Sequence, residues 1–179
     1  MTNRLTSRLS RHAALLTRVA LTLSLAASCA VAQRTDEPNW VNTREVLNYP
    51  LTMEKIDKWA GATRGVITYA KSHPEILAKI RGTNEVTVKT LDDLVALAKV
   101  KAGEYVAIVE SNGIKFREYL LVSGSLIAAM VVVQMSGHGG DASGLPMVNP
   151  ANVAFVKANK AKLDALFAEY QTLAKGGGQ

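Results

Sequence analysis

Residues 116–134, FREYLLVSGSLIAAMVVVQ, are the most apolar segment of the chain after the N-terminal region and the most informative one for its fold. No charged residue lies between Tyr119 and Met135, and apolar residues fall on every face of the helix that this stretch would form. A helix that is apolar all round lies either at the centre of a bundle or inside a membrane. A membrane span needs about 20 apolar residues, whereas this run is shorter and contains Gly124 and two serines. We therefore predict a buried central helix, with a transmembrane helix as the alternative.

Helix signals also precede this stretch. Thr52 is a good N-cap for a helix with one apolar face, and Pro74 should end that helix because the residue before a proline is pushed out of the helical region. Pro74 can open a short helix that ends near Gly82. Residues 83–89 are predicted to be a loop that leads to Thr90, the N-cap of a further helix. That helical region is interrupted at Gly103 and should end at Gly113, which suits a left-handed C-terminal cap.

A last helix follows the stretch. Asn149 can cap it and Pro150 can occupy its first position. Apolar residues then recur at alternating spacings of three and four up to Ala174, which predicts one amphipathic helix of more than twenty residues. The predicted fold class is therefore all-α, a single-domain bundle of about five helices around one apolar central helix.

The predicted helical domain covers residues 51–174. Residues 33–50 are rich in polar and charged side chains and are expected to form an extended N-terminal lead-in, with Trp40 and Val41 as possible docking residues. Residues 175–179, Lys-Gly-Gly-Gly-Gln, are expected to be a disordered tail.

Residues 1–32 have the three parts of a secretory signal peptide. A basic region is followed by an apolar run, which ends at Ala30-Val31-Ala32, a small-x-small cleavage pattern that places the mature N-terminus at Gln33. We therefore predict a periplasmic or secreted protein. Cys29 leaves an alternative open, because the preceding Ala-Ala-Ser resembles a lipoprotein box. Lipidation at Cys29 would anchor the protein, and it is the one condition under which we expect a membrane to be a partner.

Charge and cysteine content exclude several function classes. The 179-residue chain has a formal net charge of +6 from 21 basic and 15 acidic residues. Four of the basic residues lie in residues 1–32, which leaves 17 basic against 15 acidic residues and a net charge of +2 for the remainder. This small charge, with 6% aromatic residues, argues against nucleic acid as a partner. One cysteine permits neither a disulfide framework nor a cysteine-rich zinc site.

Polar residues at the start of the central helix form the candidate site. Arg117, Glu118 and Tyr119 begin that helix and Asn152 lies in the first turn of the last one. If both helix starts face the same end of the bundle, these four residues could bind a ligand there, with Arg117 available for an anion or a carbonyl. The simpler interpretation is that they only cap and join helix ends. No nucleophile–base pair, metal-ligand set or cofactor motif is present, so we predict no catalytic residue, metal or cofactor.

Three short segments also resemble a known group when taken in order. These are Leu51-Thr-Met-Glu-Lys, Phe116-Arg-Glu-Tyr and Asn149-Pro-Ala-Asn-Val-Ala-Phe155. Together they resemble an uncharacterised family of small secreted or lipid-anchored helical bacterial proteins. The resemblance implies a periplasmic or extracellular helical domain and carries over no catalytic residue.

Two function classes follow. The first is a binding or interaction module of the cell envelope, which holds a small apolar ligand or a partner protein. The alternative is an enzyme with a site near Arg117, Glu118 and Asn152. The absence of a catalytic constellation in the sequence favours the first class.

Overall fold

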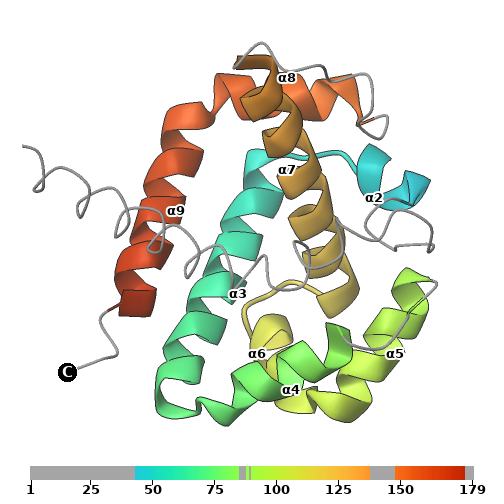
Figure 1. Cartoon of the computed structure of the whole chain (residues 1–179), viewed down its shortest axis with the longest axis vertical. Coiled ribbons are helices and arrows are strands. Elements are labelled where there is room, and N and C mark those ends of the chain that lie inside the picture. Colours follow the sequence, from blue (N-terminus) through green and yellow to red (C-terminus); the bar gives the residue numbers. More distant parts are fainter. Residues whose placement is uncertain (1–42, 85–87, 89, 138–147, 176–179) are drawn as a thin grey trace, which may run out of the picture.

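The computed structural model describes residues 43–84, 88, 90–137 and 148–175, and within these residues all regular secondary structure is helical (Figure 1). The all-α class predicted from the sequence is therefore confirmed. The helices of this part of the chain are α2 (Arg44–Asn48), α3 (Met53–Ser72), α4 (Glu75–Asn84), α5 (Leu91–Lys101), α6 (Gly103–Ser111), α7 (Phe116–Gly137), α8 (Pro150–Ala158) and α9 (Lys160–Lys175).

Helix α7 is the central helix, as its uniform hydrophobicity predicts. Residues 119–126 are all buried, whichever side of the helix they occupy. α2, α3, α5, α6 and α8 all contact α7, and α9 packs on α3. In Figure 1, α4, α5 and α6 lie at the lower end of the molecule and α8 crosses its upper end. The amphipathic helices therefore bury their apolar faces around a shared core.

The core between α3, α7 and α9 is built around Trp59. Its indole N–H donates a hydrogen bond to Ser123 Oγ at 2.7 Å, so that the ring is buried without an unsatisfied donor. The ring packs against Tyr119 from α7, and against Phe167 and Tyr170 from α9, with centroid separations of 6.4, 6.2 and 5.9 Å. One aromatic side chain thus joins the three longest helices.

Helix ends lie where their capping residues predict. The hydroxyl groups of Thr52 and Thr90 accept hydrogen bonds from the backbone N–H three residues later, and Asn149 caps α8 with Pro150 at its first position. Gly113 has a φ of +79°, the left-handed conformation that glycine adopts without steric cost. These local predictions are confirmed.

The predicted extended lead-in, residues 33–50, is wrong over part of its length. Residues 33–42 lie outside the described residues, but Arg44–Asn48 form the short helix α2, capped by Thr43. Val46 and Leu47 are buried there, and Ser125 Oγ of α7 donates a hydrogen bond to the carbonyl oxygen of Val46. A five-residue helix is not stable alone. It forms because α7 supplies the apolar surface, which no local pattern reveals.

The prediction of one long C-terminal helix is also wrong. The chain turns at Asn159, which separates α8 from α9 and has a φ of −108° and a ψ of 15°. Its side-chain amide donates to the carbonyl oxygen of Phe155 at 2.9 Å, an acceptor it shares with its own backbone N–H. Asparagine side chains compete with the backbone in this way and favour helix ends. The turn lets α8 cross the end of α7 while α9 runs along α3 (Figure 1).

The end of helix α4 differs from the prediction, and several other predicted segments lie outside the described residues. Helix α4 continues past Gly82 to Asn84, so Thr83 and Asn84 are helical rather than part of the predicted loop. Residues 85–87 and 89 of that loop lie outside the described residues, as do residues 1–42, with the predicted signal peptide, and residues 176–179 of the tail.

Helix α7 is long and apolar enough to cross a membrane, by length and composition, over Phe116–Ser136. About half of that apolar window is buried inside the molecule (50%). The first half of α7 therefore serves as a core helix, while the second half, from Ile127, is less completely covered.

Candidate functional site

Arg117 joins three helices. Its Nη1 and Nη2 donate to the two carboxylate oxygens of Glu45 in α2 at 2.6 and 2.9 Å, and its Nε donates to Asp92 in α5 at 2.7 Å. The hydrogen bond to Glu45, followed by that to Asp92, raises the pKa of Arg117 above its ordinary value. All three guanidinium nitrogens are used. That Arg117 is available for an anion or a carbonyl stays a prediction, because these three bonds use three of its five N–H donors.

Glu118 and Asn152 both contact Tyr49, from opposite directions. The Tyr49 hydroxyl donates to Glu118 Oε1 at 2.8 Å. The Asn152 side-chain amide donates to the Tyr49 carbonyl oxygen at 2.8 Å and accepts from the Leu51 N–H at 3.0 Å. Asn152 is 1% exposed, so these bonds satisfy a buried amide. The structure thus brings these two site residues together through the segment that links α2 to α3.

Burial and the hydrogen bond to Glu118 raise the pKa of Tyr49 to about 12, with burial the larger cause. The phenol therefore stays protonated, and remains a donor, throughout the neutral range. Lys55 Nζ lies over the Tyr49 ring at 4.0 Å from its centroid, a cation–π contact. Tyr49 therefore makes contacts through its hydroxyl with Glu118, through its ring with Lys55 and through its carbonyl oxygen with Asn152.

Tyr119 points into the core and does not join this group. Its hydroxyl lies 3.3 Å from Thr63 Oγ1, and its ring packs against Trp59, Tyr105 and Phe116. Burial raises the pKa of Tyr119 above its ordinary value. Of the four predicted site residues, Glu118 and Asn152 share a partner, Arg117 bonds to other carboxylates, and Tyr119 is a core residue. A ligand-binding role for them stays a prediction; the hydrogen bonds of Arg117, Glu118 and Asn152 described above join segments of the chain.

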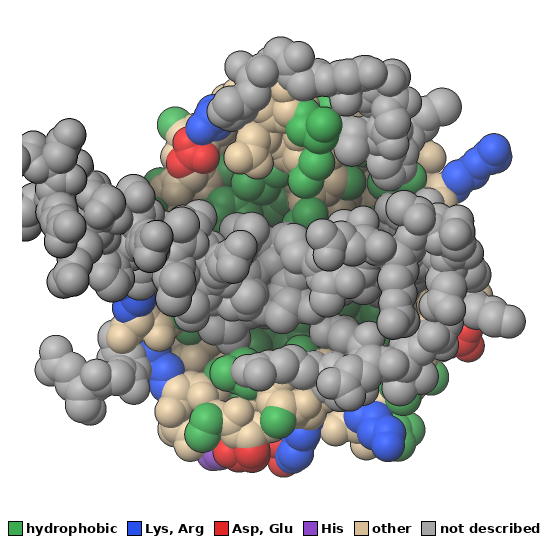
Figure 2. Space-filling view, viewed as in Figure 1, with side chains coloured by type: hydrophobic (Ala, Val, Ile, Leu, Met, Phe, Trp, Pro, Cys, Tyr) green, Lys and Arg blue, Asp and Glu red, His purple; other side chains and the backbone are tan. Residues whose placement is uncertain are grey.

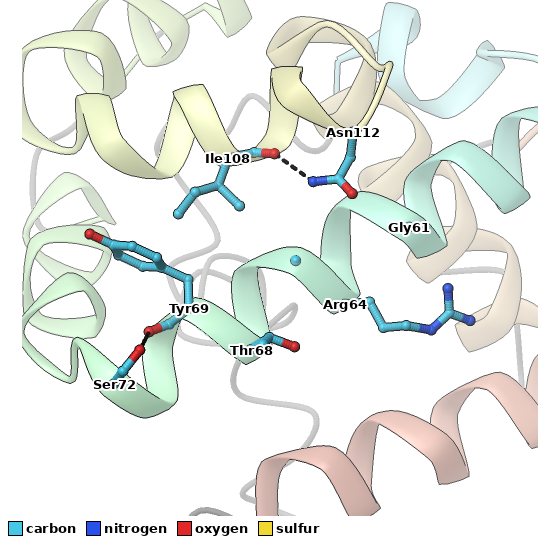
Figure 3. A pocket seen from close by; sticks show the side chains of 8 residues that line it. Gly61, Arg64, Thr68, Tyr69, Ser72, Ile108 and Asn112 are labelled. Atoms are coloured by element: carbon cyan, nitrogen blue, oxygen red, sulfur yellow. Dashed lines mark hydrogen bonds between the residues drawn. The ribbon is translucent and has the colours of Figure 1, made fainter.

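An open groove on α3 was not expected from the sequence (Figure 3). It has a volume of about 600 Å³ and is bordered by α6 on one side. Six lining residues come from α3 and two from α6, namely Gly61, Arg64, Gly65, Thr68, Tyr69 and Ser72, with Ile108 and Asn112. None of these residues is a site residue predicted above.

Two glycines that lie one helical turn apart on α3 form the floor of the groove, where no side chain rises from the helix backbone. A Cβ at Gly65 would lie 2.7 Å from Asn112 Nδ2, so glycine lets the Asn112 amide lie against α3. A Cβ at Gly61 would meet nothing within 4 Å. The pair of glycines inside an otherwise good helix is the signal by which sequence reasoning could have found this groove, since glycine destabilises a helix interior by about 1 kcal/mol relative to alanine.

Polar groups with hydrogen-bonding capacity line the groove. Arg64 uses Nε and Nη2 for Glu169 of α9, which raises the pKa of Arg64 and holds that of Glu169 below its ordinary value, the hydrogen bond being the largest cause of both. Its Nη1 is not used in this pair. Asn112 donates to the Ile108 carbonyl oxygen at 2.8 Å, while its own side-chain oxygen and the Thr68 hydroxyl make no hydrogen bond within the described residues.

Within the described residues there is no group of three or more His, Cys, Asp and Glu side chains that could hold a metal ion. Comparison of the chain with known protein families, with curated proteins and with solved structures finds no match. The function is therefore argued from the geometry of the chain itself.

Proposed function

We propose that this chain is an exported protein of the cell envelope that binds a segment of a partner protein in the groove on α3. The pattern of residues 1–32 supports export, and so does the resemblance to small secreted or lipid-anchored helical bacterial proteins. The observation that carries the binding role is the groove floor, where Gly61 leaves open space that nothing within the described residues fills.

A glycine at this position has no packing reason within the described chain. Gly65 accommodates Asn112, but Gly61 accommodates no neighbour. Glycine in a helix is favoured where another backbone approaches closely. A peptide backbone lying along α3 would gain that close approach at both glycines.

The polar groups of the groove suit a peptide backbone. Arg64 Nη1 can donate to a carbonyl oxygen, and the Asn112 side-chain oxygen can accept from an N–H. The Thr68 hydroxyl can do either. The carbonyl and N–H groups of a peptide between α3 and α6 could therefore pair with these side chains.

A small apolar ligand, the other occupant considered for a binding module, fits this groove less well. Such ligands are held in concave sites that bury most of their surface and are lined mainly by apolar side chains. The groove is open to solvent, and Arg64, Thr68, Ser72 and Asn112 are exposed along it. No observation favours the enzyme alternative, because Arg117, Glu118 and Asn152 are used in contacts that join helices.

Site-specific photo-crosslinking in cells tests the proposal. A photoreactive residue replaces Thr68 in the groove or, as a control, Val100 on α5, which is 81% exposed. We expect one discrete protein adduct from position 68, identified by mass spectrometry, and none of that mass from position 100. Gly61→Leu should remove most of the adduct without lowering the melting temperature, because a Cβ there meets nothing.

Gly103→Leu is the matched control, since a Cβ at Gly103 also meets nothing within 4 Å and Gly103 begins α6 outside the groove. This variant should retain the adduct. The proposal fails if positions 68 and 100 give the same products, or if the folded Gly61→Leu variant cross-links as well as wild type.

A further inference from the structure

The turn at Asn159 interrupts an apolar repeat that runs through α8 and α9 without a change of phase. Val156 of α8 and Leu163 and Tyr170 of α9 are buried, and each lies seven residues after the one before it. A repeat of seven keeps side chains on nearly the same side of one continuous helix. No proline and no glycine lies between Ala151 and Lys175. Residues 150–175 therefore have the sequence of a single helix, although the chain turns within it.

The turn departs little from a helix. The Asn159 N–H still donates to the Phe155 carbonyl oxygen and the Leu163 N–H to the Asn159 carbonyl oxygen, both at 3.0 Å and at the four-residue spacing of an α-helix. The φ of −108° and ψ of 15° at Asn159 differ from helical values of about −63° and −42°. The Asn159 side-chain amide adds its own bond to the Phe155 carbonyl oxygen. A change of backbone angles at this position would join α8 to α9.

Helix α9 makes its main contacts on one side. Among the described residues it packs on α3 and, next to the turn, on α8 (Figure 1). Ala161, Ala165, Ala168 and Thr172, at spacings of three and four, are exposed on its other side. Figure 2 shows acidic and basic side chains over the beginning of α9, at the upper left of the view. Helix α9 is therefore bound to the rest of the chain chiefly through its contact with α3.

The contact between α3 and α9 is specific. Lys162 Nζ donates to Asp57 Oδ1 at 3.0 Å, and Arg64 Nη2 donates to Glu169 Oε2 at 3.1 Å. The Tyr170 hydroxyl donates to the Ala60 carbonyl oxygen at 3.0 Å. None of these contacts requires that both helices belong to the same chain. Helix α9 of a second copy could form all of them, which is the condition for exchange of an identical element between copies.

We infer that the side of α3 on which α9 packs also binds α9 of a second copy of this chain. In this dimer α8 and α9 of each chain form one helix through Asn159, and the two chains exchange α9 symmetrically. The exchanged dimer and the single chain make the same contacts between α3 and α9, so protein concentration and the residue at position 159 decide between them. The groove on α3 is lined by α3 and α6 of one copy, so the inference does not depend on the proposed function.

Two substitutions at Asn159 test the hinge. Both Asn159→Ala and Asn159→Gly remove the side-chain bond to Phe155, but alanine favours the interior of a helix and glycine disfavours it. Each variant is unfolded in urea and refolded at high protein concentration, and its mass in solution is measured by light scattering after size exclusion. We expect a dimer fraction several-fold higher for Asn159→Ala than for Asn159→Gly. Equal fractions, or no dimer of Asn159→Ala, would overturn the inference.

A pair of charge variants shows whether α9 is exchanged. One variant carries Asp57→Lys and Arg64→Glu on α3, and the other carries Lys162→Asp and Glu169→Arg on α9. All four positions are exposed, so the substitutions leave the core unchanged. Each variant alone places like charges between α3 and α9, whereas a mixed dimer with exchanged helices pairs opposite charges at both contacts.

The two charge variants, each also carrying Asn159→Ala, are unfolded together, refolded together and weighed by native mass spectrometry. We expect mixed dimers well in excess of the random share. Mixed dimers at the random share would overturn the inference, because they would show that the copies associate through another surface.

Discussion

Asn152 holds the backbone of Tyr49 across 103 residues of sequence, through a hydrogen bond of 2.8 Å from its side-chain amide to the Tyr49 carbonyl oxygen. The same amide accepts from the Leu51 N–H, so one buried side chain fixes the path of the chain between α2 and α3. At the other end of Tyr49 the hydroxyl bonds to Glu118. The polar residues that suggest a binding site in the sequence therefore act in this structure as a joint between α2, α7 and α8.

Asn152→Ala should destabilise the protein by about 3 kcal/mol, because it leaves the Tyr49 carbonyl and the Leu51 N–H buried without their partner. Urea unfolding followed by circular dichroism measures the loss. Asn48→Ala is the matched control, since Asn48 is exposed and its side-chain amide donates within α2, to the Arg44 carbonyl oxygen. A loss below about 1 kcal/mol for Asn152→Ala would contradict the role assigned to it.

A double-mutant cycle should separate the two ends of Tyr49. Tyr49→Phe and Glu118→Ala remove the same hydrogen bond, so their effects on unfolding free energy should be coupled by about 1 kcal/mol. Glu118→Ala and Asn152→Ala act on different atoms of Tyr49 and should be additive within about 0.5 kcal/mol. Strong coupling in the second pair would instead indicate that Glu118 and Asn152 form one unit, as a shared pocket floor would require.

Ala129→Asp should destabilise the bundle by about 4 kcal/mol, because Ala129 is fully buried on α7 and the new carboxylate would have no partner there. Ala154→Asp places the same change at an exposed position of α8 and should cost less than about 1 kcal/mol. Thermal melts of both variants give the comparison. Equal stability of the two variants would argue against α7 as the core helix.

Stability should fall at alkaline pH through the buried tyrosines. Burial raises the pKa of Tyr105, Tyr119 and Tyr170, and it raises that of Tyr49 to about 12. Between pH 10 and 12 the unfolded chain loses phenol protons that the folded chain keeps, so the unfolding free energy decreases as pH rises through this window. Below pH 10 these groups contribute no pH dependence. Urea unfolding between pH 8 and 11 measures the change, and Tyr49→Phe should reduce it. A flat profile would contradict these shifts.

Export should give a mature chain that begins at Gln33, because Ala30-Val31-Ala32 precedes it. Intact-mass measurement of the exported protein determines its N-terminus. Substituting Ala32 with a bulky residue should block cleavage and leave a larger product. A diacylglycerol-modified Cys29 at the N-terminus would contradict cleavage at Gln33 and identify the protein as a lipoprotein.

Much of the fold could be predicted because its signals are local. Thr52, Thr90 and Asn149 cap helices through hydrogen bonds to backbone groups two or three residues away. Pro74 and Gly113 restrict or permit backbone angles at their own positions. The uniform hydrophobicity of residues 119–135 identifies the helix that must be surrounded. These signals do not depend on where the rest of the chain lies.

The candidate site depended on contacts that are distant in sequence. Four polar residues could be named as candidates, but their partners could not, since Glu45, Asp92 and Tyr49 reach them only after α2, α5 and α7 have packed. The groove on α3 also depends on a contact between residues that are distant in sequence. Gly61 and Gly65 stand out in the sequence as helix-interior glycines, yet only the position of Asn112 from α6 shows that one is filled and the other open.

The all-α class, most helix ends and the identity of the central helix follow from the amino-acid sequence alone, because capping, proline and hydrophobic periodicity act within a few residues. Three features become apparent only in the folded chain: residues 44–48 form a helix, the last helix divides at Asn159, and Asn152 binds the backbone at Tyr49 and Leu51. Each of these features is stabilised by a surface or a partner supplied by another helix. The stabilising free energy of these contacts is therefore gained only when the helices pack together, and no local sequence pattern predicts it.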